Sequence, residues 1–243
     1  MKIVTADARP DLWESARSAF SDVWPEYNLH GDVSGQYFGA LVPRHARFQF
    51  LVWDDADDRA VARGRSLPLA WDGTLDDLPA GIDAAGLRAL EASRPPNTLC
   101  ALAAEVAGDV QQRGLSSVVI GAMADIARGE GLDPLIAPVR PSWKERYPLT
   151  PIAEYATWLR DDGLPFDPWV RVHARLGADV LATETCSMRI TARVADWERW
   201  TGMEFPTDGE YVFPHGLAPL EVRDGVGHYW EPNVWMLHRV GAA

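Results

Sequence analysis

The sequence has little that would tie it to an oxidising compartment or to a membrane. It contains two cysteines, Cys100 and Cys186, and they do not form a metal-type pair. No apolar run approaches membrane-spanning length, and the first residues, Met1 to Ala6, lack the long apolar core of a signal peptide. We therefore expect a reduced, cytoplasmic protein that has no membrane as a partner.

Positive charge is also scarce. The 243 residues carry 23 Lys and Arg against 35 Asp and Glu, which gives a formal net charge of −12. This excess of negative charge argues against nucleic acid as a partner and weakly favours a cationic substrate. The histidines His215, His228 and His238 share no metal-ligand spacing, so we expect no metal site. A length of 243 residues suits one domain, or one domain with an extension.

One stretch, residues 97–141, has the pattern of a strand, a tight turn, a helix and a second strand. Thr98 to Val106 is an apolar run of strand length, and Leu135 to Arg140 contains a second one. Between them, apolar residues recur at the spacing of one helix face, at Leu115, Val118, Val119, Ala122, Met123 and Ile126. Gly129 and Gly131 then supply a stop. This order predicts a right-handed parallel crossover.

The turn between the first strand and the helix is expected to bind a phosphate group. Its residues are Gln111, Gln112, Arg113 and Gly114, followed by Leu115 and Ser116 at the start of the helix. Successive backbone N–H groups and the partial positive charge of the helix N-terminus would converge there on one anion. A side chain at Gly114 would obstruct close approach of the backbone. Alternatively, this could be a purely structural strand-to-helix turn that binds no phosphate.

The same segment resembles the GNAT superfamily, the N-acetyltransferase-like acyl-CoA transferases. Their motif is V-x-x-x-x-[QR]-x-x-G-x-[GA], and Val106, Gln111 and Gly114 match it, whereas Ser116 replaces the usual Gly or Ala. The resemblance implies that the loop from Gln111 to Ser116 binds the pyrophosphate of acetyl-CoA or another acyl-CoA, without a metal. It also implies that the pantetheine arm lies beside the first strand, near Val106.

The resemblance implies an α/β fold. Its mixed, mostly antiparallel sheet has a central splayed parallel pair and is flanked by helices. We expect a GNAT-like domain over residues 1–194, with insertions at 71–96 and 142–167, and a strand-rich C-terminal extension over residues 195–243 packed on the same domain. In that part of the chain, Asp179 to Thr183 and Met188 to Val194 are predicted to be a pair of strands.

Two residues are the predicted catalytic groups. Glu105 lies on the strand before the loop, where several GNAT enzymes place a glutamate, and could take a proton from an amine directly or through water. His173 falls where many of these enzymes have a tyrosine that protonates the departing thiolate, and an imidazolium could do the same. Tyr147 and Tyr155 are alternative acids. Each of these residues could also have only a structural role.

The expected function is acyl-CoA-dependent N-acyl transfer, most readily of acetyl, to a small-molecule amine by direct attack. Two alternatives stay open: an acyl-CoA decarboxylase or hydrolase on the same fold, and a non-catalytic CoA-binding regulator. The oligomeric state is also open, with a homodimer as one option. The aromatic residues of segment 142–167, among them Tyr147 and Trp158, are expected to wall the acceptor side.

Overall fold

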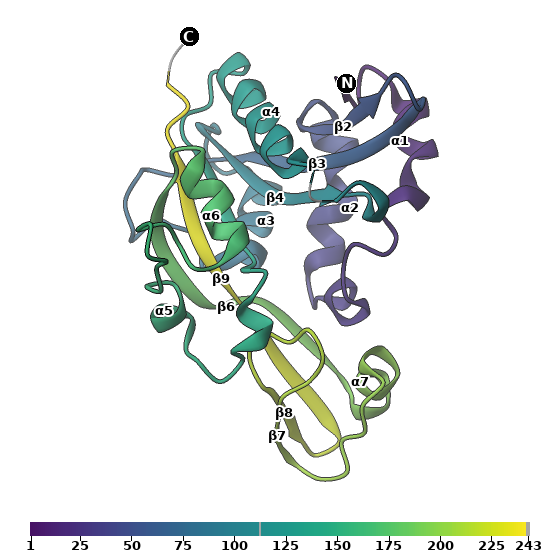
Figure 1. The fold of residues 1–243 in the computed structure, drawn as a ribbon, viewed down its shortest axis with the longest axis vertical. Coiled ribbons are helices and arrows are strands. Elements are labelled where there is room, and N and C mark those ends of the chain that lie inside the picture. Colours follow the sequence, from purple (N-terminus) through teal and green to yellow (C-terminus); the bar gives the residue numbers. More distant parts are fainter. Residues whose placement is uncertain (112, 242–243) are drawn as a thin grey trace.

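The computed structural model describes residues 1–111 and 113–241. Its strands form a mixed sheet in the order β1-β2-β3-β4-β5-β9-β8-β7, and β6 also pairs with β9 (Figure 1). The strands are β1 (Lys2–Thr5), β2 (Gln49–Asp54), β3 (Arg59–Leu69), β4 (Thr98–Val106), β5 (Leu135–Val139), β6 (Asp179–Arg193), β7 (Gly209–Tyr211), β8 (Leu220–Arg223) and β9 (Val226–His238). The β4–β5 pair is parallel and the other pairs are antiparallel, so the predicted fold class is confirmed.

The predicted crossover is present as β4, α4 (Leu115–Gly129) and β5. The β4–β5 register covers only Leu99 with Leu135 and Cys100 with Ile136. Beyond this point β4 remains paired with β3 as far as Val106, while β5 pairs with β9. The two parallel strands therefore splay apart after Cys100. This leaves the β5-facing edge of β4 without a neighbouring strand and opens the middle of the sheet.

Helices cover both faces of the sheet around this opening. The chain contains α1 (Pro10–Ser15), α2 (Ser34–His45), α3 (Gly81–Glu91), α5 (Ile152–Tyr155), α6 (Pro168–Arg175) and α7 (Val194–Thr201). Side chains of α1, α4 and α6 belong to one apolar core, and those of α2 and α3 belong to a second. Because the sheet is split, residues from both layers can reach one central space.

The C-terminal part contributes to the middle of the sheet. Strand β9 pairs with β5 through Val234 to His238 and with β6 along most of its length, forming the long ribbon in the lower half of Figure 1. The prediction that residues 179–194 form a pair of strands was wrong. These residues form the single strand β6, whose register shifts between Glu184 and Met188. The division at residue 194 stays a prediction.

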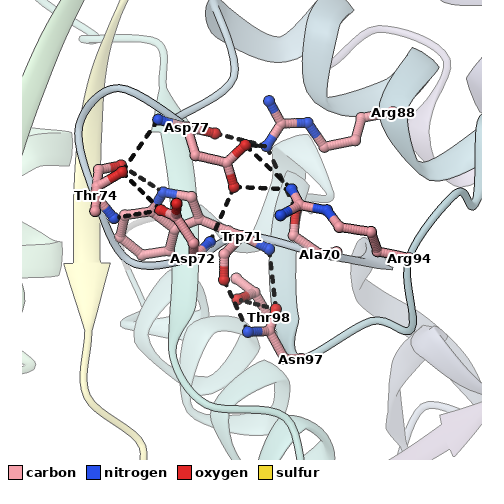
Figure 2. A network of polar contacts seen from close by, with 9 residues as sticks. All are labelled: Ala70, Trp71, Asp72, Thr74, Asp77, Arg88, Arg94, Asn97 and Thr98. Carbon is pink, nitrogen blue, oxygen red and sulfur yellow. Dashed lines mark hydrogen bonds and ion pairs between the residues drawn. The ribbon is translucent and has the colours of Figure 1, made fainter.

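The insertion at 71–96 is an ordered loop followed by α3. Figure 2 shows the loop closed by Asp77, whose carboxylate accepts hydrogen bonds from Arg94 at 2.8 and 3.1 Å. The Asp77 carbonyl accepts one from Arg88 at 2.6 Å. Asn97 brackets Trp71 by accepting from its backbone N–H at 2.9 Å and donating to its carbonyl at 2.8 Å. These bonds tie the loop to the ends of β3 and β4.

None of the described helices is long and apolar enough to cross a membrane.

Candidate functional site

The N-terminus of α4 borders a cavity, and no described side chain caps its backbone donors. Gly114 precedes the helix at φ +76°, in the left-handed region, where glycine is favoured over other residues. A Cβ added at Gly114 would meet nothing within 4 Å, so the loop is open on this side. Uncapped N–H groups at the positive end of a 15-residue helix are suited to an anion.

This helix end opens into a cavity of about 1230 Å³ that passes through the splay between β4 and β5. Gln111, Gly114, Leu115 and Ser116 line its mouth, and residues 101–106 of β4 and 137–140 around β5 line its middle. At the other end lie α1, the turn after it and α2, with Trp13, Trp24 and Phe38. Val106 borders the cavity, and its role in CoA binding stays a prediction. Arg113 is exposed and does not line it, and Gln112 lies outside the described residues.

Glu105 lines the cavity within a buried ion-pair cluster. Its carboxylate accepts two hydrogen bonds from Arg63, at 2.6 and 2.8 Å, and one from the Trp24 indole at 3.1 Å. The Nε of Arg65 lies 3.4 Å from the same carboxylate. Both Glu105 oxygens therefore already accept hydrogen bonds, and a guanidinium touches each of them. A direct role for Glu105 as a base stays a prediction, and these contacts disfavour it.

The two arginines of this cluster were not predicted from the sequence. Arg63 and Arg65 are two residues apart on β3, so their side chains point to the same face of the sheet. The Arg63 guanidinium lies 4.6 Å from the Phe20 ring centre and 5.6 Å from that of Trp13. A usable signal was present, because two charges at this spacing inside a largely apolar strand are costly unless they are paired or functional.

A second buried pair joins Arg140, which follows β5, to Glu231 on β9. Arg140 also donates to the Tyr27 hydroxyl at 3.0 Å and to the His215 carbonyl at 2.7 Å. Asn28 donates to Glu231 at 2.9 Å. Because its guanidinium is occupied by these partners, Arg140 is positioned to hold the walls of the cavity together.

His173 is buried on α6, borders the cavity and contacts a second histidine. Its Nδ1 lies 2.9 Å from Nε2 of His238 on β9, and its own Nε2 has no hydrogen-bond partner among the described residues. Burial, reinforced by His238, lowers the pKa of His173 to about 3. The predicted imidazolium therefore does not form at neutral pH. The ring there is neutral, with Nδ1 against His238 and Nε2 buried without a hydrogen-bond partner among the described residues.

The aromatic residues of segment 142–167 pack on one another. Tyr147 and Trp158 have ring centres 5.0 Å apart, and Tyr155 and Trp158 are 5.1 Å apart. Asp167 accepts a hydrogen bond from Tyr155 at 2.9 Å and caps α6. Only Ser142 of this segment lines the cavity, so the prediction that its aromatics wall the acceptor side was wrong. The walls at that end come from α1, its following turn and α2.

The residues that line this cavity contain no obvious metal centre. Within residues 1–111 and 113–241, no three His, Cys, Asp or Glu side chains are placed so that they could hold a metal ion. The groups that do line the cavity are backbone donors, guanidinium–carboxylate pairs, a neutral imidazole and aromatic rings.

A split parallel pair, an uncapped helix N-terminus at its mouth and a through-sheet cavity are the features expected of a protein with the GNAT fold. The chain is 30% identical to the arginine N-acetyltransferase avaD of Aspergillus versicolor, over 97% of this chain and 93% of that protein. The chain belongs to the GNAT superfamily and is an enzyme of the acetyltransferase type. No family model matches it.

Two solved structures share the fold along their whole length. The loading GNATL domain of CurA from Lyngbya majuscula has a TM-score of 0.63 and 16% identity, covering 98% of this chain and 97% of that one. The GNAT-like decarboxylase GphF, solved in complex with isobutyryl-CoA, has a TM-score of 0.62 and 16% identity, covering 99% and 100%. At this identity the likeness concerns the fold.

Proposed function

We propose that the chain is an acyl-CoA-dependent N-acyltransferase that moves an acetyl group to a small amine by direct transfer. The observation that carries the proposal is the single cavity, whose lining includes both the anion-suited end of α4 and residues of α1 and α2. A volume of about 1230 Å³ leaves room for a second substrate beside the pantetheine arm. The relationship to an arginine N-acetyltransferase makes arginine, or a compound that contains it, the first acceptor to try.

On the donor side, backbone N–H groups of Leu115 and Ser116 would hold the pyrophosphate, with Gly114 allowing close approach. Gln111 and Val106 border the same end of the cavity. The pantetheine amides would then hydrogen-bond to the free edge of β4 in place of the missing β5 partner. A backbone N–H on this edge would polarise the thioester carbonyl and stabilise the oxyanion.

In the reaction, the amine nitrogen attacks the thioester carbon, a C–N bond forms and the C–S bond breaks. The attacking nitrogen loses one proton, and the CoA sulfur gains one. If Nδ1 of His173 accepts from His238, its Nε2 carries the proton, and this buried N–H would reach the departing sulfur only after a side-chain rearrangement. Glu105 would hold Arg63 and Arg65 in place at the acceptor chamber, and any role in deprotonation would run through water.

The test is release of free thiol from acetyl-CoA in the presence of L-arginine and a panel of other small amines, beside a control without acceptor. Amine-dependent release, with an N-acetylated product detected by mass spectrometry, is the expected result. Acceptor-free release would instead favour a hydrolase, and acceptor-free loss of carbon dioxide from malonyl-CoA would favour a decarboxylase. CoA binding without turnover of any substrate would favour a regulator.

A further inference from the structure

Among the charged side chains that line the cavity, positive charges outnumber negative ones. Among the described lining residues, Glu14 is paired with Arg17 at the rim, Glu105 with Arg63, and Glu231 with Arg140. Arg65 is a fourth guanidinium and has to share Glu105 with Arg63. The cavity of a protein with a net charge of −12 thus carries one excess positive charge at its acceptor end.

The surroundings of Arg65 are suited to binding an anion. Its guanidinium lies 5.9 Å from the Trp13 ring centre on α1 and 5.6 Å from that of Phe38 on α2. Its buried Nε faces the Glu105 carboxylate at 3.4 Å without forming a hydrogen bond, so Glu105 compensates this cation only in part. The side chain is 24% exposed, in a cavity rather than on the outer surface. Desolvation lowers the pKa of Arg65, which indicates that the cation lacks sufficient local compensation.

We propose that Arg65 is a specificity residue that binds a carboxylate of the acceptor, so that the substrates are amines that also carry a carboxylate, such as free amino acids. A planar guanidinium with unused donors matches a carboxylate geometrically and compensates its charge. The rings of Trp13 and Phe38 flank the guanidinium and would cover the carbon chain next to the carboxylate. This assignment rests on the proposed N-acyl transfer and names its class of acceptor.

The location of Arg65 separates this subsite from the CoA-binding end. Arg65 is on β3, in register with Ala103 of β4, and its ring neighbours belong to α1 and α2. The uncapped end of α4 borders the same cavity through residues of another element. In an α-amino acid bound at Arg65, the amine nitrogen is two bonds from the carboxylate carbon.

The experiment compares acids with matched acceptors that lack the carboxylate. L-Arginine, L-argininamide and agmatine, and also L-tryptophan and tryptamine, are titrated by calorimetry into the protein saturated with CoA. The same compounds are tested as acceptors with acetyl-CoA. A charge-assisted hydrogen-bonded pair implies that at least one acid binds about 10- to 100-fold more tightly than its amide or its decarboxylated partner.

Variants at Arg65 assign that preference to the guanidinium. R65Q should reduce the affinity for the acid to that of its partner and leave the partner's affinity and the KM for acetyl-CoA unchanged. R65K keeps the charge and should restore part of the preference. R47Q is the matched control, because Arg47 is an exposed arginine paired with Glu130 and does not line the cavity. It should behave as wild type. Circular dichroism melting checks that each variant is folded.

The outcomes separate the subsite from the reaction. Acid preference in binding without turnover of any amine would refute the transfer reaction while supporting the carboxylate subsite. Equal affinities for acids and partners in the wild type, or no binding of any acid, would overturn the subsite even if other amines are acetylated. Loss of acetyl-CoA affinity in folded R65Q, with the acid preference intact, would also overturn it, because Arg65 would then serve the donor.

Discussion

The buried His173–His238 pair should make the protein sensitive to mild acid. The pKa of His173 is lowered from an ordinary 6.5 to about 3, and that of His238 from 6.5 to about 4, in both cases mainly through burial. Both rings are therefore neutral in the folded protein at pH 5, whereas the unfolded chain takes up a proton on each near pH 6.5. The unfolded state binds more protons, so stability is present in full above pH 6.5 and falls as the pH is lowered.

The size of this loss of stability follows from the difference between the folded and unfolded pKa values of each histidine. Between pH 7 and pH 5 each ring should remove about 2 kcal/mol from the free energy of unfolding, before coupling between them is considered. A loss of this size is a large part of the total stability of a domain.

Urea denaturation at pH 7, 6 and 5 measures this slope for wild type, His173→Gln and His238→Gln. Each variant is expected to be less stable at pH 7 and to lose about 2 kcal/mol less than wild type between pH 7 and pH 5. Titration of the other groups cancels because slopes are compared. His30→Gln is the matched control, since His30 is exposed, and it should keep the wild-type slope. If His173→Gln and His238→Gln both follow the wild-type pH dependence, the rings are already protonated or solvated in the folded protein and the reasoning fails.

Four further substitutions at three positions test the ion-pair cluster, the loop before α4 and the aromatic cluster of segment 142–167. Glu105→Gln should destabilise the fold by about 3 kcal/mol in urea denaturation, because it leaves Arg63 without its full counter-charge. Unchanged stability with a changed pH–rate profile would instead support a base. Gly114→Glu should abolish CoA binding in calorimetry by blocking and repelling the anion, whereas Gly114→Ala should cost about 1 kcal/mol of stability because of its positive φ. If folded Gly114→Glu binds CoA as tightly as wild type, the loop before α4 is not the CoA-binding site. Trp158→Ala should lower stability by about 2 kcal/mol and leave the acceptor KM unaltered. A raised acceptor KM at unchanged melting temperature would return the aromatic cluster to the acceptor site.

The central crossover was predictable because its signals are local. Thr98–Val106 was predicted as a strand at the same bounds, and the apolar face of the helix identified α4 and its start at Leu115. The uncapped α4 end at Gly114 follows from a turn that only a few residues determine. The strand edge open to the pantetheine was expected only through the family resemblance, because splaying depends on strands distant in sequence.

The acceptor end could not be predicted in the same way, because its contacts join distant segments. Arg63 meets Glu105 only through the register of β3 and β4, which a bulge shifts between Arg65 and Ser66. His238 reaches His173 only because β9 is inserted between β5 and β6. The aromatic residues of 142–167 have the composition of a pocket wall, and composition alone did not reveal that they pack on one another.

The placement of β9 has a consequence for how the chain is synthesised. Strands β5 and β6 are made first, and each leaves an edge without a partner until residues 226–238 have emerged from the ribosome. Until then β5 has only β4 as a partner and β6 has none, and such open edges can recruit foreign strands. We therefore expect chains that end before residue 226 to aggregate more readily than the full chain, because the strand that completes the middle of the sheet is missing.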